Sequence, residues 1–279
     1  MSNASTERPL LVIEAGRAES HYWRDIWRYR ELFYFLAWRD ILVRYKQTVI
    51  GILWALLRPL LTIVVFTVVF GRLANLPSDG VPYPILVCAA MLPWQFFATA
   101  FAEAGNSLVA NSNLVSKVYF PRFIVPASAV VVSVVDFLIS LLILIGLMLW
   151  YGVIPDWRIL TLPGFLLIAF GAALGAGLWI AALNVRYRDF RFVIPFLVQM
   201  GLFISPVGFS SSIVPEQWRL LYSINPMVGV IDGFRWSVAG SEATFYWPGF
   251  VLSLALVIAV LVTGIAYFRR TERTFADVI

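Results

Sequence analysis

Apolar runs of about 18 residues or more recur along this chain, and they limit how it can fold. In water such runs would aggregate, whereas in a bilayer each one is long enough to form a transmembrane helix. Only 13% of the 279 residues are charged, about half the share found in a soluble domain, and the mean hydropathy is +0.83. The sequence therefore predicts an all-α polytopic membrane protein.

The apolar runs divide into six expected spans, at about residues 49–70, 84–105, 123–150, 160–183, 192–209 and 248–268. The third run is longer than a bilayer needs, so we expect it to tilt or to bend near Pro126. Together the spans form one domain, residues 49–279, which ends in a C-terminal tail. Residues 1–48 form an N-terminal segment with no apolar core near its start, so we expect no cleavable signal peptide.

Lysine and arginine are distributed unevenly among the connecting segments. Residues 1–48, the second and fourth connections and the tail hold sixteen, whereas the remaining connections hold four. Because such residues concentrate in cytoplasmic loops, both termini are expected in the cytoplasm. Topology thus accounts for the pI near 9.5, and a nucleic-acid partner is not expected.

Residues 22–46 have the periodicity of an amphipathic helix, and they join the first span without a linker. Its aromatic face suits the headgroup layer, where rings are buried and polar tips stay hydrated. Two interpretations remain open: a membrane anchor, or an anchor that also docks a cytoplasmic partner. The face comprises Trp23, Trp27, Tyr34, Trp38, Ile41 and Tyr45.

The loop of residues 111–122 is predicted to form a short helix along the membrane. Asn111 or Ser112 would cap it and Pro121 would end it. It is either a knob for a partner's groove or a turn held by interfacial aromatic residues. The side chains expected on its exposed face are Leu114, Val115, Val118 and Phe120.

The chain lacks the residues that would let it use ATP by itself. Neither Lys46 nor Lys117 completes a phosphate-binding glycine loop. One histidine and one cysteine cannot form a zinc site. Within the spans Arg58, Glu103 and Asp136 are ionisable, too few for a carboxylate relay, and Asp136 is expected as a polar residue satisfied between helices.

Between the last two spans, residues 207–247 contain two helix starts that are too short and polar to span. Pro215 precedes the first, and Asn225 would cap the second with Pro226 at its first position. Such helices can dip into the outer half of the bilayer and return where protein or water covers them.

A series of short motifs runs in order through nearly the whole chain. They are Arg44-Tyr45-Lys46-Gln47-Thr48 with Gly51, Trp54 and Pro59, Tyr83-Pro84, Pro93-Trp94-Gln95-Phe96-Phe97, Asn113-Leu114-Val115, Lys117-Val118-Tyr119-Phe120-Pro121-Arg122, Asn184-Val185-Arg186-Tyr187-Arg188-Asp189, Ser205-Pro206 and Asn225-Pro226. By this series the chain resembles the membrane subunit of type 2 ABC exporters for polysaccharides such as O-antigen, capsule and teichoic acid.

The resemblance implies a homodimer in the bacterial inner membrane, bound to two cytoplasmic ABC ATPase subunits. ATP and Mg²⁺ would bind those partners, so this chain would carry no cofactor and no enzymatic activity. The residues implied to contact the ATPase are Asn113, Leu114, Val115, Lys117, Val118, Tyr119, Phe120, Pro121 and Arg122, with Arg186, Tyr187, Arg188 and Asp189 as a second contact. The implied interface helix includes Trp23, Trp27, Trp38, Arg44, Tyr45, Lys46 and Gln47.

The implied substrate is a lipid-linked polysaccharide, exported as in lipopolysaccharide biosynthesis. Sugar faces slide on aromatic rings, so the candidate channel residues are Trp54, Trp94, Phe97, Phe101, Phe196, Gln199 and Phe203; lipid-facing or core packing is the alternative. The outer gate would contain Pro215, Trp218, Asn225 and Pro226.

Three other functions were weighed. An exporter of a small lipid or drug would have a closed pocket. A membrane glycosyltransferase would need clustered carboxylates, whereas the external acidic residues are scattered without motif spacing. A passive channel would leave the 111–122 loop without a purpose.

Overall fold

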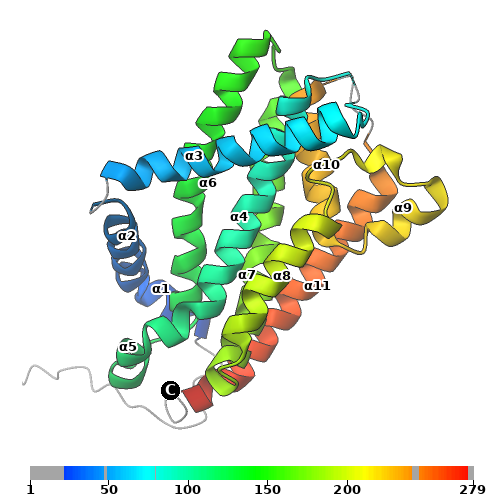
Figure 1. Ribbon diagram of the computed structural model, residues 1–279. Helices are drawn as coiled ribbons and strands as arrows, with labels where there is room; N and C mark the ends of the chain where they lie inside the picture. The colour runs from blue at the N-terminus through cyan, green and yellow to red at the C-terminus, as the bar shows by residue number, and fades with distance from the viewer. Residues whose placement is uncertain (1–21, 47–48, 79, 241–244, 276–279) are drawn as a thin grey trace, which may run out of the picture.

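The computed structural model describes residues 22–46, 49–78, 80–240 and 245–275, and within them not the side chains of residues 49–55 and 58. The regular elements in these ranges are helices (Figure 1). In chain order they are α1 (Tyr22–Arg28), α2 (Arg30–Lys46), α3 (Val49–Phe66), η1 (Thr67–Leu73), α4 (Tyr83–Ala110), α5 (Ser112–Lys117), α6 (Ile124–Tyr151), η2 (Trp157–Thr161), α7 (Leu162–Arg186), α8 (Phe190–Ile204), η3 (Ser211–Ile213), α9 (Glu216–Tyr222), α10 (Pro226–Ala239), α11 (Trp247–Thr271) and η5 (Glu272–Thr274).

Among the described residues, four helical segments are long and apolar enough to cross a membrane: α4, α6, η2 with α7, and α11 with η5. Helix α4 lies at the centre and packs against α6 and α7, while α7 packs against α11 (Figure 1). Small residues permit this close packing, as expected for membrane helices. A Cβ at Gly175 would lie 2.6 Å from the Leu261 Cα, and one at Gly177 would lie 2.6 Å from the Ala104 Cβ.

Helix α6 is continuous over 28 residues and is not interrupted at Pro126. The reason is that Pro126 lies in the first turn, where its missing N–H and fixed φ cost little. The fifth expected span, 192–209, is a helix only from Phe190 to Ile204. Ser205 precedes Pro206 and adopts an extended conformation, which ends the helix there.

The first expected span forms a helical segment from α3 through the π-helix η1, but its course differs from that of its neighbours. Figure 1 shows α3 running across α6 and α4 rather than alongside them, and it contacts both. Helix α2 instead runs beside α6, so that α2 ends well along the length of α6 (Figure 1). The expected helix over 22–46 divides at Tyr29 into α1 and α2.

Candidate functional site

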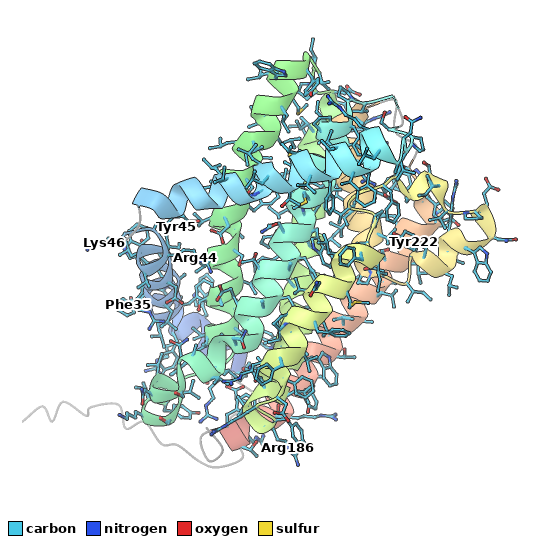
Figure 2. All side chains as sticks on the ribbon, viewed as in Figure 1. Phe35, Arg44, Tyr45, Lys46, Arg186 and Tyr222 are labelled. Carbon is cyan, nitrogen blue, oxygen red and sulfur yellow. The ribbon has the colours of Figure 1, made fainter. Side chains whose placement is uncertain are left out.

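The basic connections collect at one end of the helix bundle. Helix α5, the junction of α7 with α8 and the end of α11 lie together there, at the bottom of Figure 1, and Arg186 is labelled at this end in Figure 2. All four residues of the expected second contact, 186–189, are exposed here. The fold thus brings the two segments expected to contact an ATPase to the same end of the molecule.

Helix α5 forms within the predicted loop, but of the four side chains expected on its exposed face only that of Val118 is exposed. Val115 and Phe120 are only 1% and 3% exposed, because both pack into the core of the bundle. Val118 and Tyr119 are 49% and 61% exposed. The prediction that Val115 and Phe120 face a partner is therefore wrong, and Leu114 is half-buried. The accessible surface of the loop comprises Asn113, Ser116, Lys117, Val118 and Tyr119.

Asn111 connects α5 to α2 rather than capping α5 with its side chain. Its Nδ2 donates to the Ser107 carbonyl (2.9 Å), and its Oδ1 accepts from Nη2 of Arg39 on α2 (2.9 Å). The expected side-chain cap by Asn111 is absent, and α5 ends at Lys117, before Pro121. These hydrogen bonds therefore link the start of α5 to α2.

At the end of α2, one arginine joins three helices. Arg44 Nη1 lies 2.5 Å from Asp136 Oδ2 on α6, and its Nη2 pairs with Glu103 on α4. The Tyr45 hydroxyl donates to the other oxygen of Asp136, and burial together with this hydrogen bond raises the pKa of Tyr45. Figure 2 shows Arg44 and Tyr45 on the side of α2 that faces α6, whereas Phe35 points away.

This cluster confirms that Asp136 is satisfied between helices, but the sequence did not identify its partners. Carboxylates in apolar helices signal that a cation must come from elsewhere in the fold. The aromatic face of α1 and α2 divides accordingly. Trp23, Trp27 and Trp38 are exposed, as is Lys46, whereas Tyr45 turns inward. Gln47 lies outside the described residues.

The candidate channel residues fall into two groups. Trp94 and Phe101 on α4 are 4% and 5% exposed, and Phe97 stacks on Phe101 with ring centroids 5.8 Å apart. Phe101 packs against Ile180 and Ile194, so these rings belong to the core between α4, α7 and α8. The expectation that Trp94 and Phe101 line a channel is therefore wrong.

The other group lies on α8, where Phe196, Gln199 and Phe203 are exposed. A sequence pattern cannot distinguish the two groups, because both are aromatic stripes at helical spacing. What separates them is that α8 covers the α4 stripe and leaves its own stripe open. The Trp54 side chain is outside the described part of the chain.

The outer segment forms α9 and α10. The Asn225 cap is confirmed: its Oδ1 accepts from the Met227 N–H (3.0 Å), and its Nδ2 donates to Ser205 Oγ (2.9 Å). Helix α9 begins directly after Pro215 and exposes Trp218, and Pro226 opens α10. The Tyr222 hydroxyl, labelled in Figure 2, donates to the Ile204 carbonyl at the end of α8 (2.8 Å).

A small polar cavity lies among these outer elements. Arg219, Tyr222, Arg235 and the serines of 210–212 contribute to its lining, and its volume is about 40 Å³. Such a volume holds about three water molecules, which is too little for a sugar ring or a drug-sized ligand. The two arginines donate to backbone carbonyls, Arg219 to Val214 (3.0 Å) and Arg235 to Val207 (3.2 Å), and so fasten the outer loops.

Comparison with known proteins places this architecture among transporters. The family model described as ABC-2 type transporter matches residues 31–239. The O-antigen export system permease protein RfbA of Myxococcus xanthus is 27% identical over 266 residues, covering 92% of this chain and 98% of that protein. A protein of the same name from Klebsiella pneumoniae is 24% identical, covering 86% of this chain and 92% of that protein. The capsule polysaccharide export inner-membrane protein CtrC of Neisseria meningitidis is 27% identical, covering 85% and 90%.

Proposed function

This chain belongs to the ABC-2 type transporter family, and we propose that it is the membrane subunit of an exporter for a lipid-linked polysaccharide of the O-antigen type. It is a transport subunit without a catalytic domain. The observation that carries the proposed substrate is the similarity, over 85% or more of this chain, to proteins named for O-antigen and capsule export.

The energy for export would come from two ABC ATPase subunits bound to a homodimer of this chain. Their docking surface would be the exposed part of the 111–122 loop together with residues 186–189, since both lie at the basic end of the bundle. By the charge distribution this end, with both termini, lies in the cytoplasm. The proposed contact residues in the loop are Lys117, Val118 and Tyr119 rather than Phe120.

The polysaccharide path would run along α8. Its exposed stripe of Phe196, Gln199 and Phe203 offers ring faces and one polar group, which suits sugars that must slide without being trapped. In the homodimer this stripe would face the path. Helices α9 and α10 would form the outer gate, because α9 is bonded to the end of α8 through Tyr222.

The six-span topology is part of this proposal. Helix α8 and the segment from Pro59 to Leu73 are apolar but shorter than the four long helices. We assign α8 as span five and the segment from Pro59 to Leu73 as span one. Without these two spans, the basic connections would not all lie on the same side of the membrane.

The proposal is tested by deleting this chain in its host and analysing the glycans of the surface and of the cytoplasm. We expect surface polysaccharide to disappear and lipid-linked glycan to accumulate inside. Complementation by this chain should restore export only with an active ATPase partner. Normal surface glycan in the deletion strain, or restoration with an ATPase-dead partner, would contradict the proposal.

A further inference from the structure

The end of α11 is bonded to both the 111–122 loop and the start of α1. Glu272 Oε1 accepts a hydrogen bond from the backbone N–H of Arg122 (2.6 Å), and its Oε2 accepts one from the Tyr22 hydroxyl (2.7 Å). The Arg122 guanidinium in turn donates to the backbone carbonyl of Glu272. One carboxylate thus joins three segments that lie 150 and 250 residues apart in the sequence.

These hydrogen bonds are partly buried, and aromatic rings pack near them. Phe123 lies edge-on to Phe268 (6.4 Å between centroids), and Phe268 lies edge-on to Phe275 (5.3 Å). Trp23 packs against Phe123 from α1 (6.0 Å). All three phenylalanines are buried. Hydrogen bonds to a charged group in such surroundings are stronger than those at the surface.

The Tyr22 hydroxyl is held as a donor. Burial raises the pKa of Tyr22, and the neighbouring Glu272 carboxylate raises it further, so the hydroxyl keeps its proton. The Arg269 guanidinium lies over the Tyr22 ring at 4.6 Å and fixes the ring from the side of α11. Helix α1 is therefore fastened to α11 by two contacts of different kinds.

The position of Arg122 determines which helices a movement of the 111–122 loop can reach. Arg122 ends the 111–122 loop, and Phe123 then leads directly into α6. A displacement of α5 reaches α6 through the chain itself, and it can reach α11 and α1 through side-chain contacts. Among these, Glu272 bonds directly to the loop backbone.

We propose that Glu272 is a positioning residue that couples movement of the 111–122 loop to α11 and α1, so that α6, α11 and α1 respond together to a docked ATPase. This inference rests on the proposed function, because it needs a partner that displaces the loop. It assigns the C-terminal tail a part in energy coupling.

The test uses the complex of this chain with its ATPase partner, reconstituted in lipid vesicles with lipid-linked glycan. The quantity measured is the glycan exported per ATP hydrolysed, which a purely structural defect would not change in correctly assembled complex. We expect Glu272→Ala to lower this ratio at least about tenfold, because it removes two hydrogen bonds to a charged group.

Two further variants separate geometry from folding. Glu272→Gln keeps an acceptor for the Arg122 N–H and can donate to Tyr22, so its ratio should stay within about twofold of wild type. Tyr22→Phe removes only the hydroxyl and should lower the ratio about threefold. Thr274→Ala is the matched control, since Thr274 is exposed in the same tail and bonds locally to the Thr271 carbonyl.

The outcomes distinguish this inference from the proposed function. A wild-type ratio for Glu272→Ala, or for Tyr22→Phe if Glu272→Ala does not assemble, overturns the coupling role while the wild-type complex still exports. An equal loss in Thr274→Ala overturns it as well, because the effect would then belong to the tail in general. A wild-type complex that moves no glycan overturns the proposed function, and this inference with it.

Discussion

At the scale of single residues, the loop of 111–122 contains a buried residue that contributes to stability and an exposed residue that we propose contacts the ATPase. Phe120→Ala removes a buried ring and should lower the free energy of unfolding by about 3 kcal/mol. Val118→Asp, at an exposed position, should change stability by less than about 0.5 kcal/mol and yet uncouple ATP hydrolysis from export. Thermal unfolding in detergent and export assays on both variants check this. Normal export by Val118→Asp would contradict the docking role.

The Arg44 cluster makes a second prediction at this scale. A double-mutant cycle between Arg44 and Asp136 should give a coupling energy of about 1 kcal/mol in unfolding experiments, because the pair is half-buried and also bonded to Tyr45. The adjacent pair of Arg39 and Asp40 on α2 is more exposed and serves as the control, with an expected coupling below about 0.5 kcal/mol. Equal coupling energies for the two pairs would contradict a linking role for Arg44.

At the scale of helices, contact between α7 and α11 depends on the absence of side chains. Gly175→Ala would place a Cβ against the Leu261 backbone, which cannot move aside, so we expect a loss of about 1–3 kcal/mol in unfolding free energy. Gly146→Ala on α6 meets nothing within 4 Å and should be neutral or stabilising by up to about 1 kcal/mol. Comparable losses in both variants would contradict the packing account of Gly175, since helix propensity favours alanine at both positions and cannot cause a loss.

The connection between α2 and α3 yields another prediction for these helices. Only two residues separate α2 from α3 in the sequence, so we expect a displacement of α2 to move α3 as well, whereas a flexible insertion would absorb it. A Gly-Ser insertion after Lys46 should therefore reduce export while the complex still assembles and hydrolyses ATP. Undiminished export would show that α2 serves only as an anchor.

Much of the helical architecture follows from local sequence, whereas the partners of each helix face do not. Apolar runs located the long helices, and the Asn225-Pro226 pair located the start of α10, because both signals act within a few residues. The burial of Phe120 and Trp94 depends on segments far away in the chain. Periodicity places residues on a common face, but only the tertiary fold decides whether core, lipid or substrate covers it. For the same reason, the sequence could not identify Asp136 and Glu103 as the partners of Arg44.

At the scale of the whole molecule, the orientation in the membrane is open to direct measurement. The native Cys88 is buried, so the wild-type chain should not react with a membrane-impermeant maleimide. In the proposed topology the basic end faces the cytoplasm, so Trp218→Cys on α9 should react from the periplasmic side and Ser116→Cys on α5 only after the inner membrane is opened. The reverse pattern of labelling would invert the topology.

The bond between Glu272 and Arg122 also bears on how the protein is made. Arg122 leaves the ribosome 150 residues before Glu272, a delay of roughly 8 to 30 s at ordinary rates of translation. During that interval the docking loop lacks its link to the tail. Because this hydrogen bond forms only when the last helix has been synthesised, the loop of a nascent or truncated subunit lacks it. If the loop docks an ATPase as proposed, a subunit that ends before Glu272 would dock it less well than the full chain does.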